Sequence, residues 1–132
     1  MLTATRRGLE RAHREHAWVA QELPPPAASR HLLLVYAVEC GLKAALMRRE
    51  RAADTRQLGV RNHGHDLRAF VKELRLPRQY VLSSTRTRQD EPQPVEPRQL
   101  HEAFRYGIRL DGEERIQEEL DRIMSWLRRE LL

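Results

Sequence analysis

One long apolar segment sets the fold that this 132-residue chain can adopt. From about residue 29 to residue 49 the sequence is apolar on nearly every side of a helix, beginning with the run LLLVYAV at residues 32–38. Ser29 is a suitable N-cap for such a helix. A helix that is apolar all round must be covered by other elements, so residues 29–49 are expected to form the central, most buried helix.

The neighbouring segments have the three- and four-residue apolar spacing of amphipathic helices. A first helix is predicted over residues 5–23, before the three prolines at 24–26. Another helix is predicted over residues 67–74, with Asp66 as its N-cap, because its carboxylate can accept from the first free backbone donors. A short helical turn is expected over residues 100–106. These helices can cover the central one.

The last helix has the clearest signature, a D-x-x-E capping pair of Asp111 and Glu114 followed by an apolar seam. The seam consists of Ile116, Leu120, Ile123, Leu127 and Leu131. Residues 50–64 are expected to form a connecting loop, and residues 83–97, with three prolines, a flexible loop. No strand pattern is visible. We therefore expect an all-α fold, an up-and-down bundle of four to five helices, in a single domain over residues 1–132.

The charge of the chain permits an anionic partner. The 24 basic and 19 acidic residues give a formal net charge of +5. Lys43 and Lys72 are the only lysines, so the other 24 − 2 = 22 basic residues are arginines. An arginine excess can serve nucleic acid, or it can lie on solvated helix faces. Much of the arginine is interleaved with glutamate at helical spacing, which favours the second interpretation and leaves the first open.

The sequence argues against several functional classes. Cys40 is the only cysteine, so no intrachain disulfide can form, and a reducing, cytoplasmic setting is expected. The N-terminal segment has no signal-type apolar run, and residues 32–38 are too few to span a bilayer, so a soluble protein without membrane contact is expected. No phosphate-binding glycine loop, G-x-S-x-G motif or three-ligand cluster is found, so neither a cofactor nor a metal is expected.

Two charged residues stand out on the apolar helix. Glu39 and Lys43 are four positions apart, so they share a face and can pair. Burying either charge alone would be costly, so both must pair, reach another polar group or face a cleft. An ordinary exposed ion pair on one solvated strip of the helix is the alternative, and the sequence leaves both open.

A basic region follows this helix. Its arginines are Arg48, Arg49, Arg51, Arg56 and Arg61, and they precede His63, His65 and Asp66. Arginine binds phosphate through a planar fork and histidine exchanges protons near neutral pH, so this region can contact RNA or nucleotide, or cleave RNA. In the simpler alternative His65 and Asp66 fix the start of the next helix while the arginines are solvated.

Two short strings resemble the HEPN family, named for its occurrence in higher eukaryotes and prokaryotes. They are YAVECGLKAAL at residues 36–46 and GHDL at residues 64–67. The matching positions are Ala37, Glu39, Leu42, Lys43, His65, Asp66 and Leu67. The resemblance implies an α-helical up-and-down bundle that often dimerises. It also implies a module found beside nucleotidyltransferases in toxin–antitoxin pairs, in antiphage systems or in non-catalytic roles.

Catalytic members of that family cut RNA with an arginine, four to six intervening residues and a histidine. Arg56 and His63 satisfy this count, although Gln57 stands where Asn or Asp usually follows the arginine. Arg61 and His65 do not, because only three residues lie between them. The leading expectation is a non-catalytic or weakly catalytic HEPN-like module. It works with a partner protein in a defence or toxin–antitoxin setting and contacts RNA or nucleotide through the arginine-rich region. In it, Glu39, Lys43, His65 and Asp66 form a structural polar cluster.

Two alternatives remain open. A metal-independent ribonuclease would use His63 or His65 as general base and Arg56 or Arg61 as phosphate clamp. A structural subunit would form a homodimer or hetero-complex through exposed apolar residues, for which the sequence suggests Trp18, Trp126 and Leu132.

Overall fold

The computed structural model describes residues 2–25 and 27–132, and most of them are helical, as the sequence predicts. The α-helices of this part are α1 (Arg6–Glu22), α2 (Ala28–Glu50), α3 (Leu67–Glu73), α4 (Leu100–Arg105) and α5 (Glu113–Glu130). Its 3₁₀ segments lie at Thr55–Arg61, Arg78–Tyr80 and Pro97–Gln99, and its strands are β1 (Thr85–Arg86) and β2 (Pro94–Val95). Within these residues no helix combines the length and the hydropathy that crossing a membrane requires.

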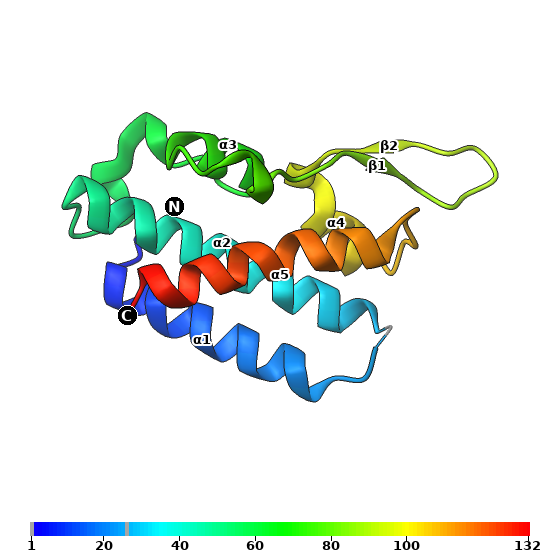
Figure 1. Ribbon diagram of the computed structural model, residues 1–132, viewed down its shortest axis with the longest axis horizontal. Helices are drawn as coiled ribbons and strands as arrows, with labels where there is room; N and C mark the ends of the chain where they lie inside the picture. The colour runs from blue at the N-terminus through cyan, green and yellow to red at the C-terminus, as the bar shows by residue number, and fades with distance from the viewer. Residues whose placement is uncertain (1, 26) are drawn as a thin grey trace.

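Three long helices lie side by side along the molecule (Figure 1). The chain reverses between α1 and α2, which are therefore antiparallel, whereas α5 returns in the same direction as α2. Helix α3 lies on the other side of α2 from α1, and the β1–β2 hairpin extends beyond it (Figure 1). Helix α2 contacts each of the other four α-helices, so its side chains can link all of them.

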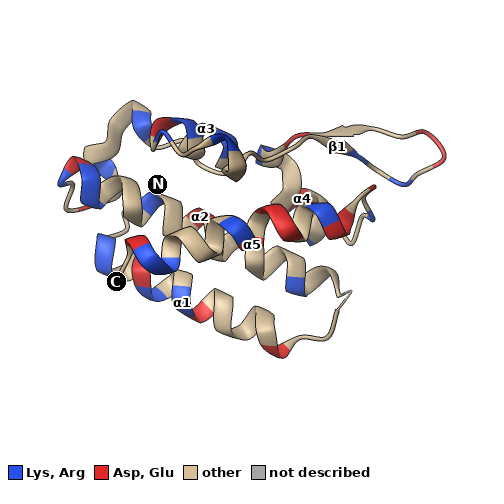
Figure 2. Ribbon diagram, viewed as in Figure 1, with Lys and Arg blue, Asp and Glu red and all other residues tan. Residues whose placement is uncertain are grey.

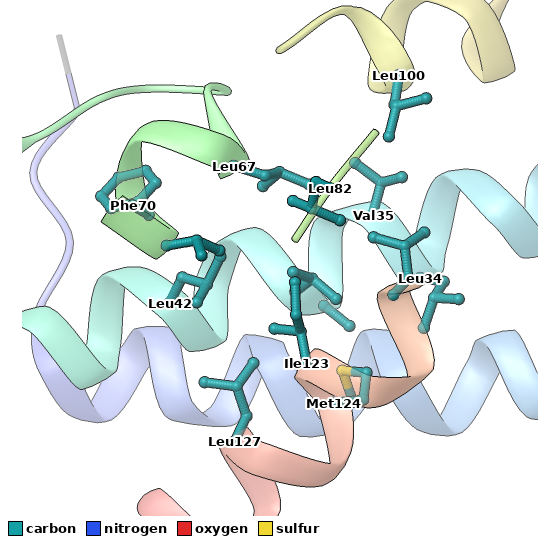
Figure 3. Packing of buried hydrophobic residues seen from close by; sticks show 14 of the residues in the cluster. Leu34, Val35, Leu42, Leu67, Phe70, Leu82, Leu100, Ile123, Met124 and Leu127 are labelled. Atoms are coloured by element: carbon teal, nitrogen blue, oxygen red, sulfur yellow. The ribbon is translucent and has the colours of Figure 1, made fainter. Parts of the chain in front are cut away.

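Helix α2 is the centre of the core, as its apolar sequence predicts. Figure 3 shows its buried side chains between those of α3 and α5, with Leu42 near Phe70 on one side and Leu127 on the other. Gly41 permits close packing here, because a Cβ atom at this position would lie 2.6 Å from Leu127 Cδ1 and 2.7 Å from His13 Nδ1. The three long helices therefore meet at a position where only glycine fits without a shift.

Two predicted helix starts are confirmed. The Thr5 hydroxyl accepts from the Gly8 backbone N–H at 3.1 Å and begins α1. Asp66 Oδ1 accepts from the Ala69 N–H at 3.1 Å and begins α3. Both side chains satisfy backbone donors that the helix itself leaves free.

Two other predicted N-caps are wrong, although both helices begin within two residues of the predicted positions. Helix α2 begins after Ala27 and has no side-chain cap, so Ser29 lies inside its first turn. Helix α5 begins after Gly112, whose φ of 68° lies in the left-handed region, and Asp111 does not cap it. Glu113 instead reaches back, and its Oε2 accepts from the Leu110 N–H at 2.8 Å. Glu113, and not the predicted Glu114, therefore bonds to the backbone ahead of this helix.

Two segments expected to be loops contain regular structure. Residues 50–64 include 3₁₀ turns within Thr55–Arg61, which are interrupted at Gly59 by a non-helical backbone conformation with a φ of 54°. Residues 83–97 contain the antiparallel pair Thr85↔Val95, and the Thr87 N–H donates to the Gln93 carbonyl at 2.9 Å. The expectation of no strand is therefore wrong. Strands of two residues are too short for an alternating pattern to appear, and their pairing depends on contacts with distant elements.

Candidate functional site

A polar cluster lies against the middle of α2, and Glu39 is its centre. Only 7% of Glu39 is exposed, and its two carboxylate oxygens have different partners. Oε2 accepts from Lys43 Nζ at 2.9 Å, and Oε1 accepts from His65 Nδ1 at 2.7 Å. The first bond follows the four-residue spacing along α2, and the second joins α2 to the residue before the N-cap of α3. Glu39 therefore fastens the start of α3 to the core.

The cluster continues to α4 through a pair of histidines. The rings of His65 and His101 are stacked, with centroids 3.9 Å apart and planes inclined by 25°. His101 is buried, and its Nδ1 has no hydrogen-bond partner in the described part of the chain. Burial, assisted by the nearby His65, lowers the pKa of His101, so its ring stays neutral at neutral pH. The His65 side chain remains about half exposed, at 51%.

Asp66 does not join this cluster, although the sequence suggested that it would. Its carboxylate points to the backbone of α3, where it caps Ala69. Three of the four predicted residues, Glu39, Lys43 and His65, therefore meet, and the fourth acts on the same helix start from its backbone side. His101 takes the remaining place, and nothing in its local sequence pattern indicates this contact.

The predicted catalytic residues point to separate acidic partners. Arg56 is 77% exposed and its Nη2 lies 3.0 Å from Asp54 Oδ2. Arg61 Nη1 lies 3.0 Å from Glu50 Oε2.

The two histidines of this region also have different carboxylate partners. His63 Nε2 lies 3.2 Å from Glu73 Oε1 at the end of α3, and its ring meets the Phe70 ring edge-on with centroids 5.3 Å apart. His65 is bonded to Glu39. Among the described residues none of the predicted arginines is bonded to either histidine, so no arginine–histidine pair forms here.

The remaining predicted arginines divide into two kinds. Arg48 and Arg49 link the end of α2 to other segments: Arg48 Nη1 donates to the Glu130 carbonyl at 2.7 Å, and Arg49 Nη1 donates to the Leu74 carbonyl. Arg51 ends α2 with a φ of 55°, and its exposed side chain has no hydrogen-bond or ion-pair partner among the described residues. Arg51 is therefore available to bind another molecule.

Two arginines that the sequence analysis did not select lie beside Arg51. Arg6 and Arg7, at the start of α1, line a shallow depression together with Arg48 and Arg51. The signal available in the sequence was two adjacent arginines directly after the helix cap Thr5. Their proximity to the end of α2 depends on the antiparallel packing of α1 and α2, which local spacing does not specify.

The described residues contain no group of three histidine, cysteine or acidic side chains that could hold a metal ion. Burial, with the nearby Glu39 carboxylate, raises the pKa of the Cys40 thiol to about 11, so this cysteine is a neutral thiol at neutral pH. Comparisons of the chain with models of protein families, with curated proteins and with solved structures gave no match.

Proposed function

We propose that this chain is a HEPN-like helical module that works with a partner protein in a bacterial defence or toxin–antitoxin system and binds RNA or nucleotide without cutting it. The proposal includes the up-and-down bundle of four to five helices and a cytoplasmic location. One observation carries its non-catalytic part: Arg56, Arg61 and His63 are each engaged by a different carboxylate.

Metal-independent cleavage of RNA needs a histidine base and a cationic clamp directed at one phosphate. A guanidinium that is paired with a carboxylate must break this pair before it can clamp a phosphate. The Glu39–Lys43–His65 cluster also supports the proposal, because it gives the two strings of the family resemblance a structural role. In this role they hold α3 on α2 and need no chemistry.

Incubation of the pure protein with labelled single-stranded RNA or tRNA in EDTA tests the proposal. A His63→Ala, His65→Ala double variant runs beside the wild type as the control for a contaminating nuclease. We expect intact RNA with both proteins. Cleavage by the wild type and none by the variant would refute the non-catalytic proposal.

A metal-independent ribonuclease is the second candidate, and one contact favours it. Glu39 accepts from His65 Nδ1, while about half of the His65 side chain is exposed. A carboxylate that fixes one nitrogen of a histidine leaves the other free to act as a general base. In this case His65, and not His63, would be the base, so His65→Ala alone would abolish the cleavage.

A structural subunit is the third candidate. Trp18 is 65% exposed and Leu132 is 96% exposed, as this alternative requires, but Trp126 packs partly against the core. Sedimentation at several protein concentrations tests self-association. A mass that rises with concentration, and a Trp18→Ser variant that stays monomeric, would support a homodimer through α1.

A further inference from the structure

A shallow depression at one end of the molecule is lined by four arginines and by no acidic residue. It lies where the first turn of α1 meets the end of α2, and its volume is about 630 Å³. Arg6 and Arg7 come from α1, and Arg48 and Arg51 from the end of α2. Figure 2 shows basic segments at the start of α1 and at the neighbouring end of α2. Folding therefore gathers positive charge from two distant parts of the sequence.

Two of the four arginines have no internal partner. Arg7 and Arg51 are exposed, and no side-chain hydrogen bond or ion pair engages either of them within residues 2–25 and 27–132. The other two arginines each have one partner. Arg6 Nη1 lies 3.2 Å from Glu10 Oε1, and Arg48 Nη1 donates to the Glu130 carbonyl. Each guanidinium has five N–H donors, so all four keep donors for a further acceptor.

Arg7 and Arg51 are locally unfavourable, the first by its charge and the second by its backbone conformation, whereas Arg48 in the last turn of α2 suits the helix dipole. Cations in the first turn of a helix face the positive end of its dipole, and the first turn of α1 contains Arg6 and Arg7 with no acidic residue. Arg51 holds a φ of 55°, a conformation in which glycine is the usual residue at a helix end. Since local stability does not explain these choices, an anion bound in the depression gives them a physical reason.

We infer that this depression binds the phosphate backbone of a nucleic acid strand, mainly through Arg7 and Arg51. The inference rests on the proposed RNA or nucleotide binding and names the class of ligand. Arginine forks match phosphate oxygens, whereas the depression has no aromatic lining on which a base could stack. Binding should therefore depend strongly on salt, show little sequence preference and not distinguish RNA from DNA.

The test measures the anisotropy of a labelled single-stranded RNA over a range of salt concentrations. The test protein carries Arg7→Ala and Arg51→Gly. A matched control carries Arg78→Ala and Arg98→Ala, which remove the same charge from exposed arginines outside the depression. We expect the test variant to lose about tenfold in affinity, and its slope of log Kd against log salt to fall by about 1.4, because each lost phosphate contact removes about 0.7. The control should change much less.

Thermal unfolding separates lost binding from lost folding. Arg51→Gly relieves an unfavourable backbone conformation and Arg7→Ala removes a charge that the helix dipole opposes, so the Tm of the test variant should stay equal or rise. A residue with a structural role would instead lower the Tm. Single-stranded DNA should bind as well as RNA, and ATP should compete only weakly.

Three outcomes would overturn the inference. Equal losses in the test and control variants would mean that overall charge, and not this depression, attracts RNA; the proposed function would then stand without this site. Equal competition by polyglutamate of matched charge would remove nucleic acid as the ligand. A wild-type protein that binds no RNA or DNA would refute both this site and the RNA-binding part of the proposed function.

Discussion

Glu39 lies inside the helical core, yet both of its carboxylate oxygens are used. A carboxylate that is taken from water without partners would be strongly unfavourable, and Lys43 and His65 supply the donors that compensate. The four-residue spacing predicted the first of these bonds from sequence. The second joins residues 26 positions apart, and the stacking of His101 on His65 comes from a third helix. Such contacts require the fold, so sequence spacing alone predicted only part of the cluster.

Removing either partner of the pair in α2 should destabilise the protein. Glu39→Ala leaves Lys43 without its carboxylate, and Lys43→Ala leaves the buried Glu39 with His65 alone, so each change should lower the free energy of unfolding by about 2 kcal/mol. Urea titration monitored by circular dichroism measures this loss.

The matched control is Glu118→Ala on α5. Glu118 forms a pair of the same spacing with Arg122 at 4.0 Å, but both side chains are more than half exposed. Its loss should change the free energy of unfolding by less than about 0.5 kcal/mol. If Glu39→Ala proved no more harmful than this control, the structural role of the cluster would be wrong.

Among the secondary-structure elements, the spacing of apolar residues predicted the long helices well and the connections between them poorly. The extent of α1, the burial of α2 and the cap of α3 all follow from short-range patterns. The hairpin does not follow from short-range patterns, because the Ser83 N–H before β1 donates to Glu119 of α5, which is 36 residues away. The start of α5 differed because Glu113 binds the backbone ahead of the helix.

Gly41→Ala should destabilise the meeting point of the long helices. Alanine usually stabilises an exposed helix relative to glycine, but here the added methyl group meets Leu127 and His13 below normal contact distance. We expect a loss of about 1–3 kcal/mol in the free energy of unfolding. Gly8→Ala on α1, where only the Thr5 hydroxyl lies near, should stay within about 1 kcal/mol of wild type. A Gly41→Ala protein as stable as wild type would contradict the packing described here.

Glu119→Ala should loosen the hairpin without unfolding the core. Glu119 is buried, and its oxygens accept from the Ser83 N–H at 3.1 Å and the Ser83 hydroxyl at 2.6 Å. Without this carboxylate the base of the hairpin loses its link to α5. The Thr87 amide should then exchange its hydrogen faster, while amides of α2 keep their protection. Equal Thr87 exchange in wild type and variant would mean that the hairpin is held by other contacts.

At the scale of the whole molecule, buried histidines make stability depend on pH. Burial lowers the pKa of His13, His31 and His101 below the ordinary value of 6.5. Once the pH falls below about 6.5 the unfolded chain binds more protons than the folded chain. The contribution of these histidines to the free energy of unfolding is therefore fully present above this pH. It is lost as the pH falls through their lowered folded-state pKa values.

Urea titrations at about pH 7.5 and about pH 5.5 measure this dependence. We expect a lower free energy of unfolding at the lower pH, and a smaller difference in a His101→Gln variant, which has one fewer buried group to protonate. A wild-type protein that is equally stable at both pH values would show that these histidines do not stay neutral in the folded chain.

Binding without cleavage is tested most directly when both are measured in one sample. Labelled single-stranded RNA is incubated in EDTA with enough protein to saturate it, and the sample is divided between a native gel and a denaturing gel. We expect a shifted band on the native gel and full-length RNA on the denaturing gel. Shortened RNA with the wild type but not with the His63→Ala, His65→Ala protein would contradict the non-catalytic proposal. An unshifted band at every protein concentration would contradict the proposed RNA binding.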